Sequence, residues 1–158
     1  MVRRLTARGY TFVELLVVTV ILLIMASAVL PLAQVTVQRQ REAELRRALR
    51  EMRTAIDEFK DAVDEGRIAT TEVEPGSQNY PPTLDALVEG VPAAGDASGG
   101  QLRFLRRIPV DPLTGDTDWG LRAYQDPPET TTWGGGNVFD VYTRSRGTGL
   151  DGTEYRNW

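Results

Sequence analysis

The chain has 158 residues, a formal charge of −4, and neither cysteine nor histidine. Its length allows one modest domain plus an appendage, and the missing residue types exclude thiol and imidazole nucleophiles, Ser-His-Asp triads and the usual zinc and haem sites. Any metal would need oxygen ligands, which favours calcium or magnesium, and the acidic balance argues against a nucleic-acid partner, which requires a concentrated basic face.

A basic segment, residues 1–9, precedes an almost wholly apolar run at residues 10–33. As a helix, this run would be about 36 Å long, enough to cross the roughly 30 Å hydrocarbon core of a bilayer. Arg3, Arg4 and Arg8 predict a cytoplasmic N-terminus, with the rest of the chain outside. Hydropathy fits a plain signal anchor equally well, whereas a secretory signal peptide would have a shorter apolar core.

Glu14 lies inside the apolar run. A carboxylate at mid-bilayer costs on the order of 2.5–3.5 kcal/mol, so such a residue usually has a partner, although near the end of the run it can also snorkel to the interface. Glu14 stands four residues after Tyr10, which becomes the first residue if the chain is cut after Gly9. We expect Glu14 of one subunit to pair with the new α-amino group of its neighbour and so to set the axial register of a polymer.

The segment Arg8-Gly9-Tyr10-Thr11-Phe12-Val13-Glu14, followed by the apolar run, resembles the class III signal of type IV pilins and type II secretion pseudopilins. The resemblance implies that a membrane-embedded prepilin peptidase cuts after Gly9 and methylates Tyr10, which replaces the commoner phenylalanine. Pro31 also resembles a proline of this superfamily that lets the helix loosen during assembly. A proline there removes a backbone donor and bends or melts the helix locally.

Residues 34–65 are predicted to form an amphipathic helix that ends at Gly66. Apolar residues recur at spacings of 4, 3, 4, 3 and 4, namely Leu45, Leu49, Met52, Ile56, Phe59 and Val63, and alanines at 48, 55 and 62 widen this stripe. Only about three heptads are present, so packing against the chain's own head is favoured over a coiled coil.

Six arginines between Arg39 and Arg53 are interleaved with Glu42, Glu44 and Glu51. Oppositely charged residues four apart, such as Glu42 and Arg46, predict a solvated helix face rather than a nucleic-acid site.

Residues 66–158 are predicted to form a globular head. Its elements are a short helix in residues 80–87 that Thr83 caps, a surface loop at residues 90–100, strands within residues 119–125 and 138–143, and a loop at residues 126–137 that links these strands. The glycines 134–136 lack the following lysine of a phosphate loop. The acids Asp111, Asp116, Asp118 and Asp126 lie around turns without the spacing of a hydrolytic pair, so we expect no enzyme.

Three features of the head resemble the G-type major pseudopilin of type II secretion systems, namely residues 80–87 (YPPTLDAL), residues 104–112 (FLRRIPVDP) and the pair Asn157-Trp158. The resemblance implies an α+β, pilin-like fold in which a long N-terminal helix packs on a small antiparallel β-sheet. It also divides the chain into a leader (1–9), a transmembrane and polymerisation helix (10–33), the amphipathic helix of the head (34–65) and the globular head (66–158).

The same resemblance implies a homopolymer that drives protein export through the outer membrane. The precursor would lie in the inner membrane and the filament in the periplasm. Its partners would be the prepilin peptidase, minor pseudopilins and the inner-membrane assembly platform. A type IV pilus subunit for adhesion, motility or DNA uptake is the alternative, and an uncleaved, signal-anchored binding protein is a third.

A calcium loop near the C-terminus is common in that family, and this sequence departs from it. Residues 143–151 contain two arginines and one acid, whereas calcium takes six to eight oxygen ligands, several of them carboxylates. Either Ser145, Asp151 and Glu154 hold calcium together with backbone carbonyls, or Arg144 and Arg146 pair with Asp151 and replace the ion. The ion-free alternative is favoured, so no cofactor is required.

Overall fold

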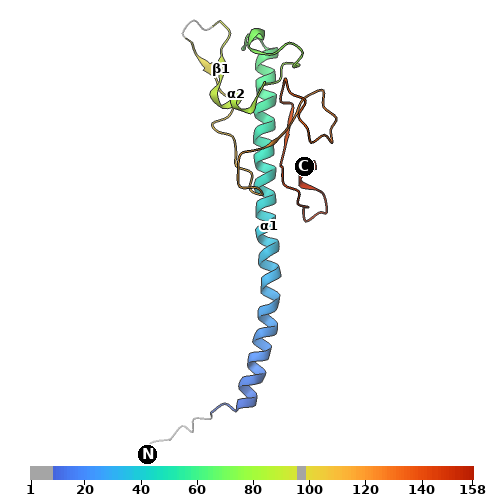
Figure 1. The fold of residues 1–158 in the computed structure, drawn as a ribbon. Helices are drawn as coiled ribbons and strands as arrows, with labels where there is room; N and C mark the ends of the chain where they lie inside the picture. Colours follow the sequence, from blue (N-terminus) through green and yellow to red (C-terminus); the bar gives the residue numbers. More distant parts are fainter. Residues whose placement is uncertain (1–8, 96–98) are drawn as a thin grey trace, which may run out of the picture. The chain divides into compact units, whose positions relative to one another are not determined.

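The computed structural model describes residues 9–95 and 99–158, without the side chains of residues 28–32 and 70. The chain divides into two compact units, Met1–Arg39 and Gln40–Trp158. The long helix α1 (Phe12–Asp64) belongs to both, and the other described helices and strands belong to the second unit (Figure 1). The fold is α+β, with a long N-terminal helix and small antiparallel sheets, as predicted.

Helix α1 ends in a glycine turn. Gly66 has a φ of 72°, a left-handed conformation that glycine adopts without a steric penalty. Its N–H donates to the carbonyl of Val63 (3.0 Å), and the N–H of Arg67 donates to the carbonyl of Ala62 (2.8 Å). These two bonds form a Schellman motif, which satisfies carbonyls that the last helical turn leaves open. Gly66 therefore ends the helix as predicted.

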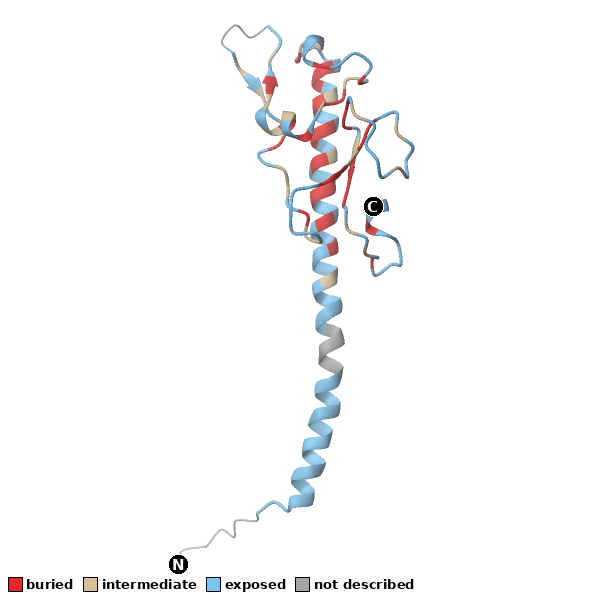
Figure 2. Ribbon diagram, viewed as in Figure 1, coloured by how far each residue is buried: buried red, intermediate tan, exposed pale blue. Residues whose placement is uncertain are grey.

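The C-terminal part of α1 is the spine of the second unit's core. The six residues of the apolar stripe are at most 3% exposed (Figure 2): Leu45, Leu49, Met52, Ile56, Phe59 and Val63. Phe59 meets the ring of Phe104 edge to face, with the ring centroids 5.5 Å apart. Burial of each large side chain contributes about 1.5–3 kcal/mol, and the stripe packs against the head, which confirms that interpretation of the pattern.

A short 3-10 helix, η1 (Thr70–Glu72), a helix and a hairpin follow α1. Helix α2 (Leu84–Glu89) is capped as predicted, because Thr83 Oγ1 accepts a hydrogen bond from the N–H of Ala86 (3.2 Å). Strands β1 (Val91–Pro92) and β2 (Gln101–Leu102) pair antiparallel. The prediction that residues 90–100 form only a surface loop was therefore wrong at β1, since a two-residue strand is too short to show alternation.

The remaining two strands that the structure describes form a second, separate sheet. Strands β3 (Gly120–Arg122) and β4 (Asp140–Tyr142) pair antiparallel, with Gly120 opposite Tyr142. Both lie inside the segments predicted as strands, and residues 126–137 link them as a loop. A Cβ on Gly120 would lie 2.2 Å from the Tyr142 ring, so this position requires glycine. A 3-10 helix, η2 (Tyr155–Asn157), follows.

Glu42 is buried, in contrast to the predicted solvated pair with Arg46. It is 8% exposed, and its Oε1 accepts hydrogen bonds from the N–H of Leu150 (2.9 Å) and the hydroxyl of Tyr155 (3.0 Å). Arg46 pairs instead with Asp151. The prediction was wrong because charge spacing along a helix carries no information about a loop that lies 108 residues further along the chain.

We predict that Glu42→Ala lowers the free energy of unfolding by about 1–3 kcal/mol, because two donors in the C-terminal segment lose their acceptor. Glu44→Ala is the matched control: Glu44 is exposed and accepts from Gln40 on the same helix, so its loss should change stability by no more than about 0.5 kcal/mol. Thermal unfolding of the detergent-solubilised full chain, followed by near-UV circular dichroism, measures both. Equal stability of the two variants would show that Glu42 does not hold the C-terminal segment.

Candidate functional site

The expected processing junction lies in exposed, non-helical backbone of the first unit. Gly9 and Tyr10 precede α1 and both are exposed, with Tyr10 at 75%. A Cβ built on Gly9 would have no atom within 4 Å. The peptide bond between these residues is accessible in the isolated chain, as a protease substrate requires. Their roles in cleavage and methylation stay predictions.

The first turns of α1 expose apolar side chains on every side of the helix. Large hydrophobic residues from Phe12 to Met25 are between 45% and 80% exposed (Figure 2). A helix that is apolar all round normally lies buried in a core or a membrane, and soluble monomers rarely expose an apolar patch larger than a few hundred Å². This surface therefore requires lipid or other protein chains to cover it.

Among the residues whose side chains are described, no helix combines the length and the apolar character that a membrane span needs. The predicted span at residues 10–33 includes residues 28–32, whose side chains lie outside that set. Pro31 is one of them. It lies within the bounds of α1, and its proposed role in loosening the helix stays a prediction, as does the span.

Glu14 has a local role that the sequence analysis did not consider. Thr11 precedes α1, and its Oγ1 accepts a hydrogen bond from the backbone N–H of Glu14 (3.2 Å). Thr-x-x-Glu at a helix start is the pattern of a capping box, and an acid in the first turn is stabilised by the helix dipole. The pattern is present in the sequence and could have been recognised there. The observed bond uses the backbone N–H of Glu14, so helix initiation at Thr11 is separable from the subunit pairing that is predicted for the Glu14 carboxylate.

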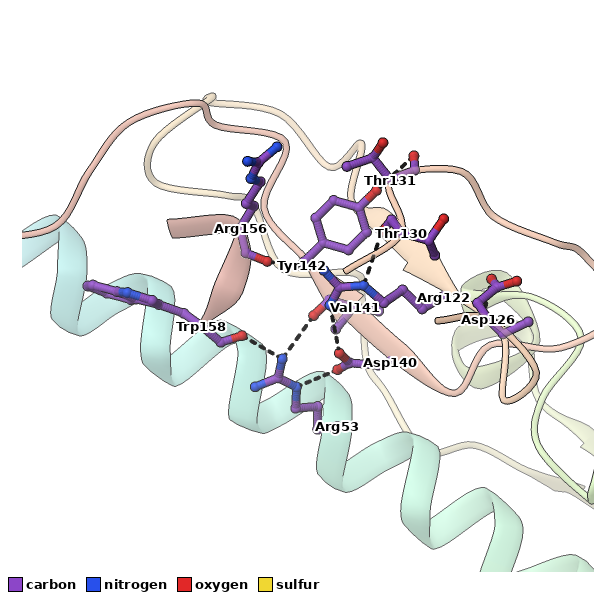
Figure 3. Close-up of polar contacts among 11 residues, drawn as sticks. Arg53, Arg122, Asp126, Thr130, Thr131, Asp140, Val141, Tyr142, Arg156 and Trp158 are labelled. Carbon is purple, nitrogen blue, oxygen red and sulfur yellow. Dashed lines mark hydrogen bonds and ion pairs between the residues drawn. The ribbon is translucent and has the colours of Figure 1, made fainter. Parts of the chain in front are cut away.

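In the second unit, Arg53 fastens the C-terminal segment and β4 to α1 (Figure 3). Its Nε donates to Asp140 Oδ1 (2.7 Å), and its Nη2 donates to the carbonyls of Trp158 (2.7 Å) and Val141 (3.2 Å). Hydrogen bonds to an ionised group are stronger than neutral ones. One side chain on the helix thus positions two segments that are far apart in the sequence.

Arg122 on β3 approaches the same carboxylate from the other side (Figure 3). Its Nη1 donates to Asp140 Oδ2 (3.1 Å), and its guanidinium lies 4.3 Å from the centre of the Tyr142 ring. Arg122 is 8% exposed, so the shared carboxylate offsets the cost of burying its charge. Asp140 therefore holds two arginines in place, one from α1 and one from β3.

The residues proposed for calcium each have a partner within the protein. Asp151 Oδ1 accepts hydrogen bonds from the N–H (2.9 Å) and the hydroxyl (2.6 Å) of Thr153, and Oδ2 lies 3.5 Å from Arg46 Nη2. Glu154 pairs with Arg156 at 2.6 Å. Ser145 Oγ accepts from the N–H of Gly147 (3.3 Å). These interactions already occupy oxygens that a calcium ion would need.

This donor set does not fit calcium in the arrangement described. Each of the two carboxylates faces an arginine, and the described residues contain no group of three or more acidic, histidine or cysteine side chains that could hold a metal. The arginine that faces Asp151 is Arg46, from α1. Arg144, which was expected to pair with Asp151, pairs with Asp118 instead (3.2 Å).

The acids around the turns of the head organise those turns. Asp111 is fully buried, and its carboxylate accepts hydrogen bonds from the N–H of Leu113 (2.8 Å) and the hydroxyl of Thr143. Asp126 Oδ2 accepts from the N–H groups of Ala123 (2.8 Å) and Gly134 (3.0 Å). These bonds close the loop between β3 and β4 and lower the pKa of Asp126 from its usual 3.8, because they favour the charged form.

We predict that Asp126→Asn destabilises the head at pH 7 and that the difference from wild type shrinks below about pH 4. A carboxyl group with a lowered pKa stabilises the fold above its unfolded pKa, and that contribution is lost as the pH falls through the folded pKa. Urea midpoints at pH 7 and pH 3 measure the difference. Glu129→Gln, which changes an exposed acid of the same loop, is the control. A pH-independent difference for Asp126→Asn would contradict the role of its charge.

Residues 4–30 match the family described as the prokaryotic N-terminal methylation motif. No curated protein matches the chain, and no solved structure matches it. The matched segment contains the Gly9–Tyr10 junction, Glu14 and the exposed apolar turns of α1. Over these residues the chain is similar to type IV pilin-like precursors, and such a prepilin-type motif implies a membrane-anchored precursor, processing by prepilin peptidase and polymerisation into filaments.

Proposed function

We propose that the chain is the major subunit of a periplasmic pseudopilus in a type II secretion system. The observation that carries this proposal is the methylation motif at residues 4–30 on a helix whose apolar surface nothing in the described chain covers. In the precursor, inner-membrane lipid covers that surface. After cleavage and extraction, neighbouring copies replace the lipid, and apolar burial at about 25 cal/mol per Å² drives their packing.

Glu14 supplies what apolar packing lacks, which is a fixed register. Apolar contact is non-directional and tolerates sliding, whereas an ion pair in an apolar environment is strongly distance-dependent. Cleavage after Gly9 creates an α-amino cation at Tyr10, and the Glu14 carboxylate of a neighbour is its partner. Assembly on the inner-membrane platform, together with minor pseudopilins, would then add subunits at a constant axial step.

The choice of a secretion pseudopilus over a surface pilus rests on the resemblance of residues 80–87, residues 104–112 and the Asn157-Trp158 pair to the G-type major pseudopilin. The chain also lacks the cysteine pair that is frequent in major pilins. A surface pilus for adhesion, motility or DNA uptake is the second candidate. It predicts long fibres in the fraction sheared from cells, whereas a pseudopilus stays with the cell envelope.

The test combines mass spectrometry of the mature chain with two substitutions at Glu14. We expect the wild-type chain to begin at a methylated Tyr10. Glu14→Ala should leave insertion and cleavage intact and abolish filaments. Glu14→Gln removes the charge but can still complete a capping box, so it should fail in the same way if the ion pair sets the register.

Two outcomes would count against these assignments. An unprocessed N-terminus would indicate a plain signal anchor and would remove the proposed function. Normal filaments from Glu14→Gln, with loss only in Glu14→Ala, would assign Glu14 to helix initiation instead of subunit pairing.

We also propose that the head is stable without calcium. Arg46, on α1, supports this because it brings a fixed positive charge to Asp151, where the ion would otherwise supply one. Calorimetric titration of the detergent-solubilised chain with calcium should give no binding heat, and chelation should leave the unfolding midpoint unchanged. Binding heat that Asp151→Asn removes would assign a calcium site to this loop.

A further inference from the structure

The second unit exposes one long face of α1 on the side opposite the buried stripe. At 100° per residue, positions 50, 54 and 61 point away from the core positions 45, 52 and 56. Arg50, Thr54 and Asp61 are exposed, whereas Leu45, Met52 and Ile56 are 0% exposed. The described residues of the head leave this face open along several helical turns.

Charge is segregated along that face. A basic patch of Arg46, Arg47 and Arg50 is followed, after the small Thr54, by an acidic patch of Asp57, Glu58 and Asp61, and all of these residues are exposed. Within the part of the chain that the structure describes, Arg46 is the only one of the six charged residues in an ion pair, with Asp151. Glu51 is also exposed and lies at the edge of the face.

Each patch contains like charges at a spacing that is unfavourable in a helix. Arg46 and Arg50, like Asp57 and Asp61, are like charges four residues apart, a spacing that destabilises a helix. The acidic patch also approaches the C-terminal end of α1, where the helix dipole disfavours negative charge, and the last turn contains no basic residue. Oppositely charged side chains from another chain would reduce both the like-charge repulsion within each patch and the unfavourable interaction of the acidic patch with the helix dipole.

The two patches have the same internal spacing. Arg46 and Asp57, Arg47 and Glu58, and Arg50 and Asp61 are each separated by 11 positions. Eleven residues make three helical turns with only about 20° of residual rotation, so both patches lie on the same face, about 16.5 Å apart along the axis. A parallel copy displaced by that distance would place the basic patch of one helix against the acidic patch of the other.

We propose that this face binds a second copy of the chain, parallel and displaced by about three helical turns, with Arg50 against Asp61 at the centre of the contact. The parallel direction of the two copies rests on the proposed function, because subunits of a filament point the same way. The self-complementary charge pattern is a property of the sequence and does not depend on that function. Thr54 lies between the patches and allows close approach. A cleft of about 620 Å³, lined in part by Arg47, Thr54 and Glu58, opens beside this face and accommodates the neighbour's side chains.

Charge exchange tests the register. Arg50→Glu and Asp61→Arg should each lower filament yield about tenfold, because each places like charges in contact. The double variant Arg50→Glu/Asp61→Arg should restore filaments, since the exchanged charges face each other again. Arg50→Glu/Asp57→Arg, which corresponds to a displacement of seven residues, is the matched control and should not restore them. Equal recovery of filament yield in both double variants, or recovery in neither, would contradict the proposed displacement of 11 residues.

Cysteine crosslinking tests the contact directly, because the chain has no cysteine of its own. Positions 50 and 61 of one chain lie about 16.5 Å apart along α1, which is too far for a disulfide within the chain. Oxidation of membranes from cells that produce the Arg50→Cys/Asp61→Cys chain should therefore yield a ladder of covalent oligomers. The readout needs no filament, so it distinguishes failure of this contact from failure of the proposed function.

The single variant Thr54→Cys is the control for direction. An antiparallel pair would also bring opposite charges together, but around Thr54, so this variant alone would form covalent dimers. We expect no Thr54 dimers and a ladder from the 50/61 pair. Dimers at position 54, or processed filaments without a 50/61 ladder, would overturn the proposal while leaving the proposed function in place.

Discussion

The apolar surface of the first turns of α1 is the constraint on which the rest of the molecule depends. Side chains from Phe12 to Met25 are exposed in the isolated chain, and the described residues contain nothing that covers them. Their burial against lipid or against copies is worth far more than the small net stability of an ordinary domain. The head must therefore be stable by itself, because the N-terminal part of α1 adds no buried apolar surface to it in the described chain.

The head achieves this with one stripe of α1 and a few polar attachments. The apolar stripe from Leu45 to Val63 forms the core, and its strands are too short to supply much stability by backbone pairing. Glu42 and Arg53 instead hold the C-terminal segments on the helix through charge-assisted hydrogen bonds. A buried charge without its partner is costly, so these contacts also select one arrangement of the loops.

Features that depend on local sequence could be predicted, and features that depend on distant loops could not. The helix stripe, the Thr83 cap and the segments containing β3 and β4 follow from periodicity and capping chemistry. The burial of Glu42 and the pairing of Arg46 with Asp151 depend on where a loop about a hundred residues away returns to the helix. Charge spacing alone therefore predicted, wrongly, that the side chain of Glu42 is exposed to solvent.

The candidate site shows the same division. Gly9, Tyr10 and Glu14 lie within a short linear motif, so sequence alone could name them as candidates. The Thr11 cap is equally local, since Thr11-x-x-Glu14 is a capping-box pattern that the sequence alone shows. The calcium question is different, since ligand geometry comes from loop folding. Only the folded chain places Arg46, a residue from another element, beside the proposed ligand Asp151.

Register is the property that an apolar polymer core cannot provide alone. Apolar packing scales with area and changes little when one helix slides along another. The pairing proposed for Glu14 would fix one distance between neighbours near the N-terminus, but it would leave the contacts between the heads undetermined. Opposite charge patches 11 residues apart on the head's part of α1 would limit that choice, because a displacement of 11 residues opposes all three arginines with acids, whereas any other displacement opposes at most one such pair. Weak pairs suffice for this purpose, since each recurs at every subunit of a filament and the penalties for a wrong register accumulate along its length.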